Sequence, residues 1–183
     1  MKIDPIWLPD VQQENFRLIL DAMSRPGRCF TLHTLPNEGA ISLSILATLL
    51  DAEVSLSDPH NLLLADDWLM LQAKVASTEE ADYVLCDAMQ LPNLSPKLGT
   101  LPNPDQSATL ILKVNNLGKG ENKLKLSGPG IKEIEYLSIS GLNLDWLSKR
   151  DDWNCAFPLG IDMIFVDEQH VAALPRTTKV DVM

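Results

Sequence analysis

Cysteine is scarce in this sequence, which has only Cys29, Cys86 and Cys155 among 183 residues. The three lie far apart, and none belongs to a C-x-x-C pair. An odd number of dispersed cysteines excludes a disulfide framework and a cysteine-based zinc motif. We therefore expect a protein of a reducing compartment, the cytoplasm.

Long hydrophobic runs are also missing. The longest, Ile41 to Leu50, is too short to span a bilayer and contains hydroxyl side chains. The first residues, Met1 to Trp7, lack the apolar core of a secretion signal. The sequence thus predicts a soluble chain that does not engage a membrane.

Basic residues are few. The chain has 15 Lys and Arg against 25 Asp and Glu, which gives a formal net charge of −10. Nucleic acids and anionic lipid surfaces repel such a chain, so neither is an expected partner. The exception is residues 113–132, where 5 Lys against 1 Glu give +4. Such a run is typical of a solvated face, although it could also meet an acidic partner or a phosphorylated ligand. Its lysines are Lys113, Lys119, Lys123, Lys125 and Lys132.

The common catalytic and cofactor motifs are absent too. Gly118-Lys119-Gly120 lacks the spacing of a phosphate-binding loop, and Gly128-Pro129-Gly130 lacks the third glycine of a dinucleotide fingerprint. The histidines, His33, His60 and His170, do not stand at metal-ligand spacing from one another or from a cysteine. Residue chemistry therefore predicts no catalytic residue, metal site or cofactor.

What the sequence does contain is an alternation of helical and extended segments over a length suited to one domain, residues 1–183. Helices are expected over Ile41–Ala52 and Asn143–Arg150, with Trp153 as the alternative end of the second. A strand over Ala108–Val114 is expected to pair in a hairpin with Lys123–Leu126, because the residues between them favour turns. Interleaved helices and hairpins predict an α/β fold with a mixed β-sheet covered by helices on both faces.

The C-terminal stretch from Phe157 to Thr178 predicts a second β-hairpin. Ile161 to Val166 is apolar and β-prone, Asp167-Glu168-Gln169 is a short polar connection, and Pro175 ends the second strand. Strand alternation then sets a register. The expected facing pairs are Val166 with His170, Ile164 with Ala172, Asp162 with Leu174, and Gly160 with Arg176.

Asp162 is the one charged residue in the first strand of this hairpin, and such a charge needs a partner when it is buried. The register puts Arg176 on the same face and within diagonal reach, so we predict an Asp162–Arg176 ion pair. Thr177 and Thr178 add two hydroxyls beside the guanidinium, a group of donors suited to an oxyanion. The favoured interpretation is a structural ion pair or a subunit contact. The alternative is a site for a small phosphate, phosphonate or carboxylate.

Five segments, taken in order, resemble PhnH, the family of the H subunit of the bacterial carbon–phosphorus lyase system. The resemblance covers nearly the whole chain and rests on the series at matching intervals rather than on one motif. The loop around Pro102-Asn103-Pro104-Asp105 is the part least like the family. The five segments are Ala22–Gly27, Ala108–Leu112, Leu126–Ile131, Phe157–Asp162 and Pro175–Thr178.

The resemblance implies an α/β fold related to the pyridoxal-phosphate-dependent transferases, without that cofactor. It also implies a homodimer that joins the G, I, J and K proteins of the system. With G, I and L, such a subunit takes part in converting a nucleoside triphosphate and a phosphonate into a ribose phosphonate triphosphate. The family offers no catalytic residue to carry over. Asp162, Arg176, Thr177 and Thr178 match its C-terminal motifs and are our ligand or interface candidates.

Overall fold

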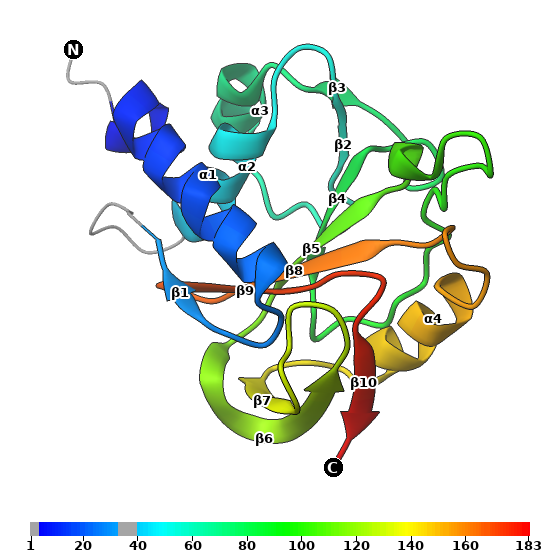
Figure 1. Cartoon of the computed structure of the whole chain (residues 1–183). Coiled ribbons are helices and arrows are strands. Elements are labelled where there is room, and N and C mark those ends of the chain that lie inside the picture. The colour runs from blue at the N-terminus through cyan, green and yellow to red at the C-terminus, as the bar shows by residue number, and fades with distance from the viewer. Residues whose placement is uncertain (1–3, 33–39) are drawn as a thin grey trace.

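The computed structural model describes residues 4–32 and 40–183. The first three α-helices gather on one side of a central sheet, and the fourth lies apart from them (Figure 1). The helical elements are the short 3-10 helix η1 (Pro5–Trp7), α1 (Pro9–Ser24), α2 (Ala40–Leu49), α3 (Ala65–Leu71), the 3-10 helix η2 (Pro104–Gln106) and α4 (Asp145–Trp153).

The strands form two sheets. A seven-stranded sheet has the order β1-β9-β8-β5-β4-β2-β3, and a three-stranded antiparallel sheet has the order β10-β6-β7. In the large sheet β3, β2, β4, β5 and β8 run parallel, whereas β9 pairs antiparallel with both β8 and β1. The strands are β1 (Phe30–Thr31), β2 (Ser55–Ser57), β3 (Lys74–Val75), β4 (Tyr83–Asp87), β5 (Thr109–Lys113), β6 (Asn116–Ser127), β7 (Glu135–Ser140), β8 (Asp162–Val166), β9 (His170–Leu174) and β10 (Lys179–Val182).

Each face of the large sheet has its own hydrophobic core. Helices α1, α2 and α3 pack on one face, where Ile111 and Ile164 of the central strands point. The other face, which includes Leu110 and Phe165, is covered by α4 and the three-stranded sheet. The predicted mixed sheet is therefore present, but a second sheet shares with α4 the face where we expected helices alone.

The central strands are apolar on both sides because both sides are covered. In β5 the run Leu110-Ile111-Leu112 is fully buried, and β8 is equally buried from Met163 to Val166. Continuous apolar strands of this kind are typical of parallel sheets between two layers. The sequence thus places β5 and β8 at the centre of the sheet, where the candidate site begins.

The predicted hairpin between Ala108–Val114 and Lys123–Leu126 is wrong. Strand β5 is occupied on both edges by the parallel strands β4 and β8, so no edge remains for a hairpin partner. The turn-like residues instead form an irregularity within β6, where Leu117 and Asn122 both lie opposite Ile139 of β7. A bulge inserts such extra residues into one strand of an antiparallel pair, and it uses the same residue types as a turn.

The two helices expected from apolar spacing are present with shifted ends. Helix α2 ends at Leu49, three residues before the predicted end at Ala52, and α4 starts at Asp145 rather than Asn143. Asn143 accepts the backbone N–H of Asp145 through its side chain at 3.0 Å, which places it just outside the helix. His33, one of the histidines considered above, lies outside the described residues.

Candidate functional site

Asp162 and Arg176 form the predicted ion pair. The carboxylate Oδ2 lies 2.6 Å from Nη2 of the guanidinium, and Oδ1 accepts the backbone N–H of Arg176 at 2.7 Å. The two side chains are only 18% and 15% exposed. Asp162, the one acid of β8, is therefore paired with Arg176, as expected for a carboxylate that is largely buried.

The register predicted for this hairpin is wrong by one residue. Val166 lies opposite Val171 and Ile164 opposite Ala173, while Leu174 lies opposite Met163 rather than Asp162. The reason is Asp167, whose backbone N–H donates to the carbonyl of His170, so only Glu168 and Gln169 form the loop. The ion pair survives the shift because Arg176 lies beyond the last paired residue, where its long side chain reaches back to Asp162.

The Arg176 guanidinium has five N–H donors, and the chain supplies five contacts for them. Nε donates to Asp162 at 3.4 Å, and Nη1 donates to the carbonyls of Pro104 and Pro158 at 3.0 and 3.2 Å. Nη2 donates to the Ser107 hydroxyl at 2.5 Å as well as to Asp162. These contacts favour the structural interpretation of the pair, since the donors expected to meet an oxyanion are already bonded within the chain.

The residues Pro175 to Thr178 form a tight turn, hereafter the Pro175–Thr178 turn. The backbone N–H of Thr178 closes it on the Pro175 carbonyl at 2.9 Å. Thr177 is exposed, whereas Thr178 is buried and its hydroxyl has no hydrogen-bond partner among the described residues. The two threonines that the sequence grouped together therefore occupy different environments, and only Thr177 faces solvent.

A second arginine holds the same turn, and the sequence did not point to it. Nη2 of Arg150 donates to the carbonyls of Pro175 and Thr178 at 2.7 and 2.8 Å. Arg150 lies in α4 one turn after Trp146, and both are buried on the same face of that helix. The sequence signal for a buried Arg150 was its helical spacing from apolar residues. That signal was not sufficient, because an exposed arginine at the border of an apolar helix face has the same spacing.

The charge of Arg150 is poorly compensated. Its side chain is 2% exposed, and the carboxylate paired with it, Asp151, is 68% exposed and 3.8 Å away. Burial lowers the pKa of the Arg150 guanidinium, and the charges of Asp151 and Asp162 oppose that change. A buried cation at this distance from an exposed acid lacks the tight pairing that a buried charge normally has.

The five segments behind the family resemblance are linked to this turn by a series of contacts. Asp162 and Arg176 join the last two segments, and Thr109 of β5 lies opposite Asp162 in the sheet. A Cβ on Gly128 (φ +132°) would lie 2.9 Å from the Thr177 carbonyl, and one on Gly130 (φ +82°) would collide with the Ser24 carbonyl at the end of α1. Contacts this close explain why glycine occupies both positions.

A cavity of about 500 Å³ opens beside the turn, between the end of α4 and the start of β10, and is hereafter the Arg150 cavity. These two elements lie next to each other in Figure 1. Arg176 contributes to the wall, but its donors are bonded elsewhere. The residues of the wall that bear on binding are Arg150, Asn154, Phe157, Thr178 and Lys179, whereas the exposed Thr177 lies at its edge.

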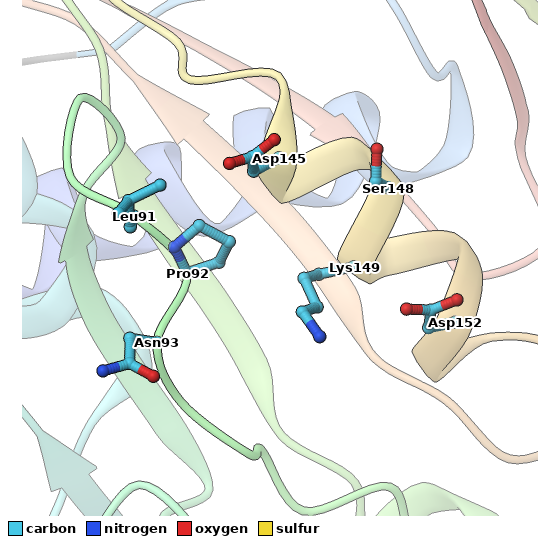
Figure 2. Close-up of a pocket in the computed structure, with 7 residues that line it drawn as sticks. All are labelled: Leu91, Pro92, Asn93, Asp145, Ser148, Lys149 and Asp152. Atoms are coloured by element: carbon cyan, nitrogen blue, oxygen red, sulfur yellow. The ribbon is translucent and has the colours of Figure 1, made fainter.

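A groove of about 340 Å³ lies on the opposite side of α4 (Figure 2). Figure 2 shows Leu91 and Pro92 of the loop after β4 on the side toward the helix, with Asn93 next to them and the Lys149 side chain in the space between loop and helix. Its four α4 residues are all exposed, as is usual for a solvated helix face. They are Asp145, Ser148, Lys149 and Asp152.

Asp167 is the other carboxylate of interest, because it lies at the carboxyl end of β8, where open α/β sheets often bind ligands. Its oxygens accept the backbone N–H groups of Leu117, Gln169 and His170 at 2.7 to 2.8 Å, and the His170 ring lies 3.1 Å away. Burial raises the pKa of Asp167, but these hydrogen bonds together bring it below its ordinary value. The carboxylate is therefore used to join the hairpin loop to β6.

The remaining histidine that the structure describes is also in a structural contact. Nδ1 of His60 accepts the backbone N–H of Asp87 at 3.0 Å. In residues 4–32 and 40–183, no group of three or more His, Cys, Asp or Glu could hold a metal ion. Within the same residues, no helix is both long and apolar enough to cross a membrane.

These features define a mixed α/β protein in which distant segments meet at an arginine-stabilised turn beside the sheet. A family model described as "Bacterial phosphonate metabolism protein (PhnH)" matches residues 6–181. The chain belongs to the PhnH family.

Two curated relatives agree with this assignment. The chain is 41% identical over 179 residues to "Putative C-P lyase subunit protein HtxG" of Stutzerimonas stutzeri, covering 97% of this chain and 89% of the relative. It is 31% identical over 184 residues to "Alpha-D-ribose 1-methylphosphonate 5-triphosphate synthase subunit PhnH" of Rhizobium meliloti (strain 1021), covering 92% of this chain and 90% of the relative. The resemblance inferred from five short segments is thereby confirmed.

Proposed function

We propose that this chain is a subunit of a carbon–phosphorus lyase system and serves the catabolism of phosphonates. With the G, I and L subunits it takes part in forming ribose 1-phosphonate 5-triphosphate from a nucleoside triphosphate and a phosphonate. The observation that carries the proposal is the family match over residues 6–181. The two relatives, one named a C-P lyase subunit and the other a synthase subunit, support it.

The chain contributes to this chemistry as part of an assembly rather than alone. The alternative from the sequence was a stand-alone binder or enzyme that uses Arg176, Thr177 and Thr178. The geometry gives that alternative little support, because the Arg176 donors are bonded within the chain. Asp162 and Arg176 instead fix the turn against the sheet, so their role in the assembly is to shape its surface.

The proposed assembly is a homodimer of this chain joined to the G, I, J and K proteins in the cytoplasm. The word "subunit" in the names of both relatives supports partners of this kind. The relationship of the fold to the pyridoxal-phosphate-dependent transferases, without the cofactor, belongs to the same proposal. Its support is the mixed parallel sheet with helices against one face.

Co-expression with the G, I and J proteins of the same bacterium tests the assembly. When this chain carries an affinity tag, the G, I and J proteins should co-purify with it through affinity and size-exclusion chromatography. The chain expressed alone should elute as a homodimer, at twice its mass of 20.3 kDa. An unrelated acidic α/β protein with the same tag is the control for adsorption. If the tagged chain elutes without the other three although all four are soluble, the proposed assembly is wrong.

A further inference from the structure

The wall of the Arg150 cavity contains a group of unpaired polar atoms. In the described part of the chain, four buried side-chain polar atoms have no hydrogen-bond partner, and three of them belong to residues that line this one cavity. They are Nε of Arg150, Nδ2 of Asn154 and Oγ1 of Thr178. Because buried polar groups are almost always hydrogen-bonded, three unpaired groups in one wall point to a partner that joins them from outside the chain.

The chemistry of these atoms specifies the partner. Nε of a guanidinium can only donate, and so can the amide nitrogen of Asn154. The Asn154 amide cannot be turned over, because its oxygen accepts the backbone N–H of Ile161 at 2.7 Å. The Thr178 hydroxyl is free to donate as well. A group that offers two or more acceptor oxygens and no donor satisfies all three.

The charges around the cavity agree with an anion. Arg176 adds no net charge to the wall, because Asp162 neutralises it. The remaining charged residues of the wall are the cations Arg150 and Lys179 and one acid, Asp151. The cavity is therefore locally positive in a chain whose formal net charge is −10. Arg150 lies in the last turn of α4, where the helix dipole disfavours anions, so the positive potential comes from the side chains.

We propose that the Arg150 cavity binds the oxyanion head group of a small molecule, with the donors of Arg150, Asn154 and Thr178 on its oxygens. The three atoms are buried behind the wall, so they reach the oxygens of an anion only when the wall opens slightly. Phe157, which is 70% exposed, stands at the rim and covers the organic part of the ligand. This site shares Thr178 with the cluster that the sequence suggested, but its other donors come from Arg150 and Asn154 rather than from Arg176.

The inference rests on the geometry of the cavity and not on the proposed function. Titration of the isolated chain tests anion binding whatever the co-expression experiment shows. The co-expression experiment tests the assembly whether or not an anion binds. Phosphate, methylphosphonate and acetate share the acceptor oxygens that the cavity requires. Comparing them separates a phosphorus oxyanion from a carboxylate as the source of the head group.

Calorimetric titration of the full chain with each of these anions, at constant ionic strength, tests the proposal. Thr178→Val removes the unpaired hydroxyl while breaking no hydrogen bond of the folded chain, and should weaken binding about ten-fold. Asn154→Asp keeps the acceptor for Ile161 but replaces the donor with a carboxylate oxygen, and should weaken binding by more than about ten-fold. Thr177→Val, on the exposed side of the same turn, is the matched control and should change affinity less than about two-fold.

The ligand-free variants give a second readout that does not depend on affinity. Without an anion, Thr178→Val removes an unsatisfied buried group, so its melting temperature should equal or exceed that of the parent chain. Saturable binding of at least one anion, weakened by both wall substitutions and kept by Thr177→Val, supports the proposal. The proposal is wrong if none of the three anions binds, or if the Thr178→Val and Asn154→Asp variants bind an anion as tightly as the parent chain does.

Discussion

Replacing Arg176 with alanine should lower the free energy of unfolding by about 3–5 kcal/mol, the usual cost of leaving one member of a buried ion pair alone. The substitution strands the Asp162 carboxylate and also frees the Pro104 and Pro158 carbonyls and the Ser107 hydroxyl. Urea denaturation at neutral pH measures the loss. A change smaller than about 1 kcal/mol, the value of an exposed pair, would contradict the buried geometry.

A double-mutant cycle separates the ion pair from these other contacts. Asp162→Ala alone removes the pair and also the acceptor for the Arg176 backbone N–H. The combined variant should therefore be more stable than the sum of the two single losses predicts, because the stranded charge is gone. Purely additive losses would mean that the two side chains do not interact.

The second large effect is expected at Gly130, where α1 ends against the Gly128–Gly130 turn. Gly130 has φ +82°, and an added Cβ would meet the Ser24 carbonyl oxygen and the Pro26 ring. Backbone strain and a clash with fixed backbone act together, so Gly130→Ala should cost about 3 kcal/mol or more. Thermal or urea unfolding of the purified variant measures this loss.

Gly118 provides the matched control for that substitution. Its φ of +86° is nearly the same, but nothing lies within 4 Å of the position an added Cβ would take. Gly118→Ala should therefore cost only the backbone strain, about 1 kcal/mol. Equal losses at the two glycines would show that α1 does not approach the turn as closely as described.

The Asp162–Arg176 pair could be predicted from the sequence although the register could not. A lone acid in an apolar strand needs a partner whatever the register, and Arg176 was the basic residue near the far end of the hairpin. The register depended on whether Asp167 belonged to the loop or to the ladder. Its side chain accepts the N–H groups of Gln169 and His170, a local contact that composition does not reveal.

The second sheet was hidden for a related reason. Gly118 and Gly120 have the residue type of a hairpin tip, yet they sit in a bulge inside β6, and both uses need the same backbone freedom. Strand β10 escaped prediction because Lys179 to Val182 is short and only its pairing with β6 makes it a strand. These features are set by contacts between distant segments, which local patterns do not encode.

Arg150 shows the same limit at the candidate site. Its place in α4 follows from helical spacing, but its burial against the Pro175–Thr178 turn depends on how α4 packs on the sheet. The five family segments were a better guide to the surroundings of the turn, because they are linked to it by a series of contacts. Residue chemistry led to the Arg176 side of the turn, and similarity at matching intervals added the segments around it, but neither pointed to Arg150.

The central claim is that this chain serves phosphonate catabolism as a PhnH-type subunit, and growth of its own bacterium tests it most directly. A strain that lacks the gene should grow normally on inorganic phosphate and fail on methylphosphonate as the sole phosphorus source. A plasmid that carries the gene should restore growth on methylphosphonate. Growth of the deletion strain on methylphosphonate at the rate of its parent would contradict the claim.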